Sequence, residues 1–266
     1  MIEVHDNKTE TARHLGLARS TLYYQSKKPA KDWQLKQTIE ATLVKHPSYG
    51  SRRIAQTLGF NRKKIKRVMN KFGLKPYRRR RLKYRKIKAK LIKYPNQLRT
   101  TLLTQPHQIW ASDFTYLSHQ GRTIYVCTVM DIFTRQVVGV SVLTTHTSQL
   151  VIQAIWNALL HFPRPAIFHS DNGSEYQSAL TINLLAKLAI EVSRSTPGCP
   201  WENGYQESFY SKFKVELGDP NRFASLGELV AEIYQTIYYY NTQRIHSALA
   251  MPPNQFLNRH LLQTGV

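Results

Sequence analysis

Two acidic residues between positions 169 and 217 have the types and the setting that metal chemistry needs. Asp171 follows the apolar run 166–168 and precedes Asn-Gly, so we expect it to project from the end of a short buried strand. Glu207 lies where large apolar side chains recur every fourth residue, which predicts a helix with one apolar face. A third acid, Asp113, lies far upstream and is expected to join them in space.

The predicted helix around Glu207 separates an apolar face from an acidic one. Its apolar face would consist of Tyr205, Phe209, Phe213 and Leu217. At 100° per residue, Glu207 lies about 200° from Tyr205 and roughly 20° from Lys214. Glu207 and Lys214 should therefore face outward together while the apolar face packs on a sheet. Glu202, the rival carboxylate, precedes the helix or faces its wrong side.

Three acids from separate elements repel each other unless a cation neutralises them, and oxygen-only ligand sets suit Mg²⁺ or Mn²⁺. Two such ions about 3.5 to 4 Å apart can activate an attacking oxygen and stabilise a leaving one in phosphodiester chemistry. We therefore expect two Mg²⁺ or Mn²⁺ ions at Asp113, Asp171 and Glu207, with Lys214 on a substrate phosphate. Taken alone, each acid could instead be a helix cap or a solvated surface charge and not a metal ligand.

Other polar residues near the predicted site have several interpretations. Asp131 ends a predicted strand beside Arg135, and a structural turn pair of these two residues is the favoured interpretation. His169 and Asn172 flank Asp171, where substrate positioning and turn stabilisation are both open.

The three acids and the residues around them resemble a known family. Asp113, Asp171 and Glu207, with 35 residues between the last two, are similar to the DD35E arrangement of retroviral integrases and related transposases. The sequences of four segments resemble the second-reading-frame (OrfB-type) protein of the IS-three family of bacterial insertion-sequence transposases. These segments are 110–116, 169–174, 201–209 and 240–249. The resemblance spans residues from about 40 to 258. Glu202 and Glu175 stand where the family usually has Asp and commonly has Gln, and neither change touches the three acids.

The resemblance implies a transposase that binds the ends of its insertion element, cleaves DNA strands and transfers them into target DNA. It also implies a homo-multimer that synapses two ends, with DNA as partner and without a small-molecule substrate. Two alternatives remain: a catalytically decayed protein that occupies element ends, and a ribonuclease H that acts on hybrids. A DNA strand-transfer assay distinguishes the three.

The positive charge is concentrated in the first part of the chain. The net charge is +22, and residues 1–105 hold 28 lysines and arginines against 5 acids, whereas residues 106–266 hold 10 against 11. Residues 61–90 carry 16 basic side chains and no acid. This density favours nucleic acid. A membrane surface is the competing polyanion, but the chain has no run of 18 apolar residues.

The basic part is predicted to be helical. Residues 8–26 are typical of a helix-turn-helix around Gly16, and a linker is expected over 28–32. Residues 49–54 resemble a Tyr-Gly-x-Arg-Arg-Ile signature of the family's small helical module. Asn61 should cap a helix that turns Ile65, Val68, Met69 and Phe72 inward. The candidate DNA contacts are Arg19, Ser20, Thr21, Arg52, Arg53, Arg62, Lys63, Lys66, Arg67, Arg78, Arg79, Arg80 and Arg81. A solvated helical face is the alternative for Arg62, Lys63, Lys66 and Arg67, and an ordinary helical hairpin is the alternative for residues 8–26.

From residue 108 the pattern changes to alternating strands and helices. Strands are predicted at 109–117, 123–133, 136–143, 166–170 and 190–193, and helices at about 148–161, 178–189, around Glu207 and at 226–240. This order is typical of a ribonuclease-H-like α/β sheet, in which the first strand is central and the fourth is its neighbour. Asp113 and Asp171 would then meet.

The sequence predicts that the chain consists of five parts. These are a partial helix-turn-helix at 1–30, a helical DNA-binding module at 31–76, a basic arm at 77–105, the catalytic core at 106–258 and a tail at 259–266. Pro252 and Pro253 are expected to end the fold. Cys127 and Cys199, the two cysteines, indicate incidental thiols in a reducing compartment, and no zinc-finger spacing occurs. Without a signal peptide, the expectation is a cytoplasmic, nucleoid-associated bacterial protein.

Overall fold

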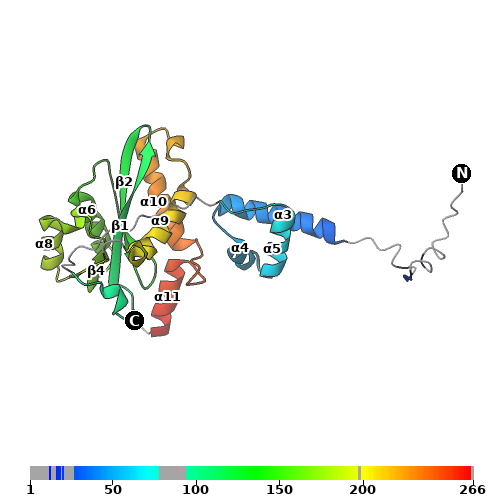
Figure 1. Cartoon of the computed structure of the whole chain (residues 1–266), viewed down its shortest axis with the longest axis horizontal. Coiled ribbons are helices and arrows are strands. Elements are labelled where there is room, and N and C mark those ends of the chain that lie inside the picture. Colours follow the sequence, from blue (N-terminus) through cyan, green and yellow to red (C-terminus); the bar gives the residue numbers. More distant parts are fainter. Residues whose placement is uncertain are drawn as a thin grey trace. The chain divides into compact units, whose positions relative to one another are not determined.

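The computed structural model describes residues 12, 16–18, 20, 27–77, 94–196 and 199–264. The chain divides into two compact units, Met1–Pro76 and Tyr77–Val266 (Figure 1). Ser20 is exposed. Six other predicted DNA contacts lie outside the described residues: Arg19, Thr21, Arg78, Arg79, Arg80 and Arg81.

Three of the described helices form the first unit: α3 (Lys28–Lys45), α4 (Ser51–Leu58) and α5 (Arg62–Lys71). They bury an apolar core of Leu35, Ile39, Ile54, Ile65, Val68 and Met69. Asn61 caps α5 as predicted, because its side-chain oxygen accepts a hydrogen bond from the amide of Lys63 at 2.8 Å.

Residues 28–32 form the first turn of α3 and not the predicted linker. Pro29 lies in that turn, where the missing amide hydrogen would have had no helical partner, so the proline starts the helix and does not break it. Asp32, also in this turn, is 2% exposed and accepts two hydrogen bonds from Arg67, at 2.7 and 2.5 Å. Lys71 adds a third at 3.1 Å. These contacts join α3 to α5.

A mixed five-stranded sheet in the order β3-β2-β1-β4-β5 lies at the centre of the second unit. Its strands are β1 (Ile109–His119), β2 (Arg122–Asp131), β3 (Val137–Leu143), β4 (Ile167–Ser170) and β5 (Glu191–Arg194). The first three are antiparallel neighbours, whereas β4 runs parallel to β1 and β5 runs parallel to β4. The central first strand and its neighbouring fourth strand confirm the predicted order.

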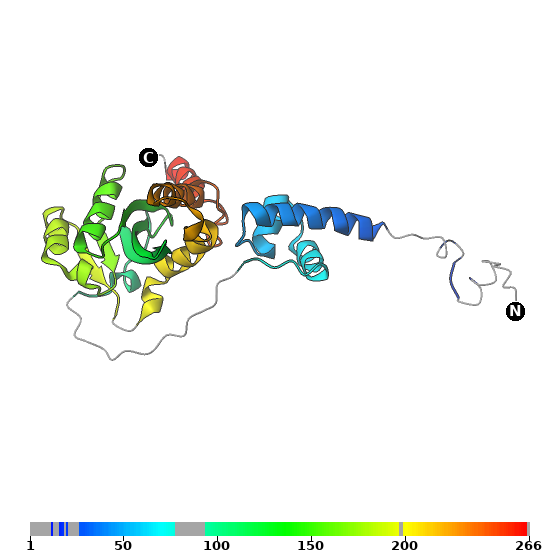
Figure 2. The same ribbon diagram turned by 90° about the horizontal axis from the view of Figure 1, so that it is seen from above.

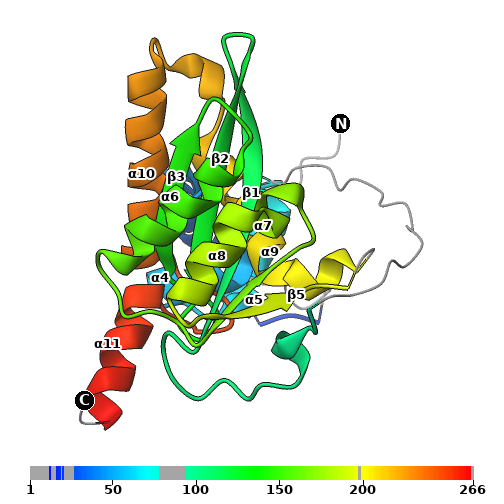
Figure 3. The same ribbon diagram turned by 90° about the vertical axis from the view of Figure 1, so that its left-hand side faces the viewer.

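Helices cover both faces of the sheet, as Figure 2 shows and Figure 3 labels. On one face, α6 (Ser148–Leu159) and α8 (Ala179–Lys187) bury Leu150, Ile155 and Leu185 against Trp110 and Val129. On the other, α9 (Gly204–Leu217) and α10 (Leu226–Thr242) bury Phe209, Phe213 and Ile233 against Val126 and Val137. Short α7 (Ser174–Gln177) precedes α8. The three layers form an α/β fold of the ribonuclease-H-like class, with a helical unit before it.

The C-terminal end differs from the prediction. Pro253 begins a further helix, α11 (Pro253–Thr264), which extends through most of the predicted 259–266 tail. A proline is well suited to a first helical turn, so the Pro-Pro pair marks a start and not a stop. Phe133, between β2 and β3, holds α11 through ring contacts with Phe256 and His260, at 5.7 and 4.9 Å between centroids.

Among the described helices, none combines the length and the apolar character that crossing a membrane requires.

Candidate active site

Two of the predicted acids stand at the same level of neighbouring strands. Asp113 is a half-buried residue of β1, and Asp171 immediately follows β4. The parallel register pairs Ala111 with His169, and each acid lies two residues further along its own strand. The topology therefore brings Asp113 and Asp171 to the same edge, as the strand order predicted.

Asp113 is a carboxylate that burial and neighbouring negative charge make hard to ionise. Its Oδ1 accepts a hydrogen bond from the amide of Phe114 at 2.8 Å. Burial, followed by the charge of Asp171 and more weakly that of Glu207, raises the pKa of Asp113 to about 7, although the Phe114 hydrogen bond opposes the shift. The three predicted acids therefore influence one another electrostatically.

Asp171 is held by a tight turn. Its Oδ1 accepts a hydrogen bond from the amide of Gly173 at 2.9 Å. Burial raises the pKa of Asp171, while this hydrogen bond opposes the shift. A Cβ atom on Gly173 would lie 3.0 Å from Oδ1 of Asp171 and 3.0 Å from Oε2 of Glu175. A larger residue at position 173 would therefore push against both carboxylates, which would have to shift slightly.

Three charged neighbours of Asp171 were not predicted as part of the site. Arg194, 1% exposed on β5, donates to Oγ of Ser170 at 2.7 Å, and its charge lowers the pKa of Asp171. Glu175, noted from the sequence only as a departure from the family pattern, raises that pKa, and His146 lowers it. The Nδ1 atom of His146 lies 3.3 Å from Oε1 of Glu175. No spacing of residues along the sequence predicts these contacts, because they join residues from three separate segments.

Glu207 lies in the first turn of α9, and its neighbours fasten that helix to β1. Gln206 donates from Nε2 to the carbonyl of Ala111 at 2.6 Å. One turn later, the hydroxyl of Tyr210 donates to the carbonyl of Asp113 at 2.6 Å. Gln206 and Tyr210 thus tie the helix that carries one acid to the strand that carries another.

These two polar contacts change the predicted apolar face of α9. Phe209, Phe213 and Leu217 are buried as expected, but Tyr205 is 38% exposed and lies outside the core. Glu207 is half-buried, and burial raises its pKa. Within the described part of the chain its carboxylate has no hydrogen bond or ion pair.

Glu202, the rival acid, is already fully engaged. Its Oε2 accepts hydrogen bonds from the amide of Thr196 at 2.6 Å and from Asn96 at 2.7 Å. Its Oε1 lies 2.6 Å from Nη2 of Arg99. These contacts lower the pKa of Glu202, although burial opposes them. This acid stabilises the loop before α9.

The three predicted acids fit a divalent cation by chemistry, but they do not form a closed ligand set. Asp113 and Asp171 each place one carboxylate oxygen in a backbone hydrogen bond and keep the other without a partner among the described residues. No lysine or arginine of the described ranges forms an ion pair with any of the three. Across these same ranges, no three His, Cys, Asp or Glu side chains are arranged to hold a metal ion. Oxygen ligands with surplus negative charge suit Mg²⁺ or Mn²⁺, and the set would have to tighten around it.

Lys214, His169 and Asn172 make structural contacts in this conformation. Lys214 donates from Nζ to the carbonyl of Tyr116 on β1 at 2.9 Å. His169 is fully buried with Nδ1 2.8 Å from Oγ of Ser193, and burial lowers its pKa to about 4. Asn172 donates to the carbonyl of Ser195 at 2.6 Å, which ties the end of β4 to the segment after β5.

Asp131 has the structural role favoured from the sequence. Its buried Oδ2 accepts hydrogen bonds from the amide and the hydroxyl of Thr134, at 3.0 and 2.6 Å. The predicted pairing with the Arg135 side chain is not present among the described contacts of Asp131; Arg135 contributes only its backbone amide, which donates to the Asp131 carbonyl at 2.9 Å. The acid is thereby part of the β2–β3 turn.

Arg244, whose role the sequence left open, holds the far end of α9. It is 1% exposed, and its Nε lies 3.3 Å from Oε1 of the buried Glu216. This ion pair joins the residues after α10 to the last turn of α9.

The predicted DNA contacts of the first unit fall into two groups. Arg52, Arg62, Lys63 and Lys66 are exposed. Arg53 is half-buried with its guanidinium 5.6 Å from the centroid of Tyr49, and Arg67 is engaged by Asp32. The second group contributes to the packing of the unit.

Comparisons with known proteins agree with this architecture. Two family models described as integrase core domain match residues 104–200 and 188–253. The chain is 31% identical over 226 residues to the transposase for insertion sequence element IS904 of Lactococcus lactis subsp. lactis (strain IL1403), covering 81% of this chain and 89% of that protein. It is 28% identical over 264 residues to the putative transposase InsK for insertion sequence element IS150 of Escherichia coli (strain K12), covering 94% and 93%.

A solved structure shows the same fold at low sequence identity. A chain of the simian T-cell lymphotropic virus intasome superposes with a TM-score of 0.53 at 17% identity, over 79% of this chain and 70% of that one. The coverage and identity of the IS904 relative, with the two integrase core matches, place this protein in a family of polynucleotidyl-transferase-type enzymes. The chain belongs to the IS-three (IS3) family of insertion-sequence transposases.

Proposed function

We propose that this chain is the catalytic transposase of its insertion sequence, which binds the element ends, cleaves DNA strands there and transfers them into target DNA. The observation that carries the proposal is the parallel register of β1 and β4, which sets Asp113 and Asp171 at the same level. There burial and the charges of Asp171 and Glu207 raise the pKa of Asp113 to about 7. Converging carboxylates with perturbed pKa values are typical of functional sites. The names of the relatives, which are transposases of insertion sequences, support the choice of substrate.

Asp113, Asp171 and Glu207 would hold two Mg²⁺ or Mn²⁺ ions. When bound, such ions polarise phosphate oxygens and stabilise the attacking and leaving oxygens of a phosphodiester displacement. Two of the carboxylates are already fixed by hydrogen bonds from backbone amides: Phe114 donates to Asp113, and Gly173 donates to Asp171. Each of these acids then presents its second oxygen.

The remaining residues of the site position the acids and the DNA. Gln206 and Tyr210 fix the first turns of α9 on β1, which keeps Glu207 beside Asp113. Lys214 donates to the Tyr116 carbonyl, and its positive charge would attract a phosphate of the DNA end. Glu202 and Asp131 take no part, because both are saturated by structural contacts.

The first unit would bind the element ends. Four of its predicted contacts are exposed: Arg52, Arg62, Lys63 and Lys66. Cations that face solvent can neutralise phosphates and release counterions, which makes binding strong and dependent on salt. Several copies acting on two ends form the proposed assembly, as the family resemblance implies.

The decisive experiment compares Asp171→Asn with Asp219→Asn in a strand-transfer assay on labelled element-end duplexes. Asp171→Asn should bind the duplex as the wild type does and lose joined product by at least about 10²-fold, a typical cost of losing one transition-state-stabilising group. Asp219 is exposed and caps a surface turn, so its variant is the matched control. Joining at the wild-type rate by Asp171→Asn removes the catalytic assignment.

The same assay separates the two alternatives. A decayed protein would bind the ends and give neither cleaved nor joined DNA. A ribonuclease H would cleave the RNA strand of a hybrid and give no joined molecules. Binding of the ions is measured separately, as a rise in Tm on adding Mn²⁺ that the Asp171→Asn variant should lose.

A further inference from the structure

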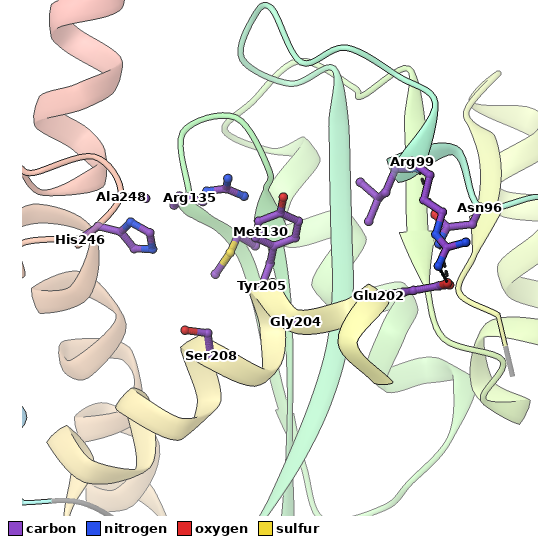
Figure 4. A pocket seen from close by; sticks show the side chains of 11 residues that line it. Asn96, Arg99, Met130, Arg135, Glu202, Gly204, Tyr205, Ser208, His246 and Ala248 are labelled. Atoms are coloured by element: carbon purple, nitrogen blue, oxygen red, sulfur yellow. Dashed lines mark hydrogen bonds and ion pairs between the residues drawn. The ribbon is translucent and has the colours of Figure 1, made fainter. Parts of the chain in front are cut away.

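A cavity of about 490 Å³ lies beside the first turns of α9. Tyr205 and Ser208 line it from the helix, Arg135 and Met130 from the β2 end, and His246 from the loop after α10 (Figure 4). Glu207, in the same helical turn, is not one of the lining residues. The cavity is therefore distinct from the site formed by the three acids, although it lies next to it along α9.

Arg135 is the unusual residue of this cavity. Its backbone has a φ of 63°, a strained value for a residue other than glycine, and the Asp131 turn holds it there. The guanidinium carbon lies 4.0 Å from the ring centroid of Tyr205. Its Nη1 atom is buried and has no hydrogen-bond partner among the described residues. A buried donor left in this way costs roughly 1 to 3 kcal/mol, which a bound acceptor would recover.

The cavity also has an unbalanced positive charge. Glu202 is the one acid among its described lining residues, and it is already paired with Arg99 at 2.6 Å. Arg135 forms no ion pair with an acid of the described ranges. Ser208 is exposed and adds a hydroxyl group. An arginine that lies against an aromatic ring and has an unbonded guanidinium nitrogen suits a phosphate group, toward which that nitrogen would have to turn.

We propose that this cavity is a second phosphodiester subsite, in which Arg135 binds a backbone phosphate of the DNA strand that reaches the three acids. Ser208 directly follows Glu207 on α9, about 1.5 Å further along the axis and about 100° around it, so a strand that passes around this side of the helix can contact both sites. The subsite would position the strand before any chemistry. The identification of DNA as the ligand rests on the proposed function.

The test uses the full chain in EDTA, where binding is observed without catalysis. A labelled oligonucleotide that contains 5-iododeoxyuridine is photocrosslinked to the protein, and the modified peptide is identified by mass spectrometry. We expect a crosslink on the peptide that contains Tyr205. Arg135→Met should reduce this crosslink at least about fivefold and lower the slope of log affinity against log salt by about one phosphate contact. Arg122→Met removes the same charge from an exposed position outside the cavity and should change neither measurement.

A second pair of variants guards against misfolding of Arg135→Met. Ser208→Asp introduces a negative charge at the exposed edge of the cavity and should reduce the crosslink. Ser208→Asn, whose side chain has the shape of aspartate without its charge, should retain the crosslink. Equal crosslink yields for wild type and Arg135→Met, or for the two Ser208 variants, overturn the subsite. The failure of Asp171→Asn to lose strand transfer would remove the catalytic proposal and leave these binding results standing.

Discussion

The two units bury aspartates in opposite ways. Asp32 in the helical unit is surrounded by Arg67 and Lys71, whose hydrogen bonds lower its pKa well below the usual range. Asp113 in the sheet unit has acids as its charged neighbours, and its pKa rises to about 7. Burial raises the pKa of both carboxyl groups and is the largest cause at Asp113. The neighbouring cations outweigh it at Asp32, whereas the neighbouring acids add to it at Asp113. Four substitutions break or sharpen this contrast.

The largest expected effect comes from Glu207→Gln. Because Glu207 has no partner in the described chain, its loss should leave stability unchanged while strand joining falls at least about 10²-fold. Glu202→Gln is the matched substitution of an acid that is already engaged, and it should cost about 0.2 to 1 kcal/mol of stability because its ion pair with the largely exposed Arg99 is lost. Urea unfolding and the joining assay measure the two effects. An equal loss of joining in both variants without any loss of stability would contradict the contrast.

Asp113→Asn should stabilise the ion-free protein at high pH. Folded Asp113 retains its proton up to about pH 7, whereas the unfolded chain releases it near pH 4. The wild type therefore loses stability as the pH rises through this window, by at most about 4 kcal/mol, and the variant does not. Urea unfolding in EDTA should show a more stable variant at pH 8 and equal stabilities at pH 4. A difference of the same size at both pH values would show that charge is not its cause.

Asp32→Asn should change stability in the opposite direction from Asp113→Asn, and by a smaller amount. The lowered pKa of Asp32 gives stability that is present above about pH 4 and is lost as the pH falls through the folded pKa. At pH 7 the variant leaves Arg67 and Lys71 without their carboxylate, so hydrogen exchange in α3 and α5 should become faster. Exchange rates that match the wild type at pH 7 would mean that this ion pair does not hold the unit together.

The smallest effect is expected from Lys66→Gln. Lys66 is exposed, so removing its charge should weaken DNA binding about twofold to threefold and reduce the salt slope by about one, with unchanged stability. Arg67→Gln, its neighbour, should also destabilise the unit because Asp32 loses its partner. Titrations at several salt concentrations, with parallel thermal unfolding, distinguish a DNA-facing residue from a packing residue.

Much of the fold followed from local patterns. The five strands appear within a few residues of their predicted ends, because alternation and turn residues are local signals. The approach of Asp113 and Asp171 followed from strand order alone, and the structure has that order. The roles of the three acids in metal binding and of the basic residues in DNA binding stay predictions.

The contacts that tune the acids were not accessible from the sequence. Arg194 and His146 act on Asp171 from segments distant in the chain, and only the folded sheet brings them together. Tyr205 matched the apolar spacing of α9, yet Gln206 and Tyr210 replaced it at the sheet because their polar groups bind backbone carbonyls. Residues 28–32 were interpreted as a linker and Pro253 as part of the end of the fold, although a proline in a first turn favours a helix.

The clamping of α9 at both ends has a consequence for how an ion could be captured. Gln206 and Tyr210 hold its start, and the ion pair between Glu216 and Arg244 holds its end. With the helix axis fixed in this way, Glu207 approaches a cation through rotation about its own side-chain bonds. Such rotations are completed in picoseconds to nanoseconds, so loading would be limited by the arrival of the ion and not by a rearrangement of the backbone.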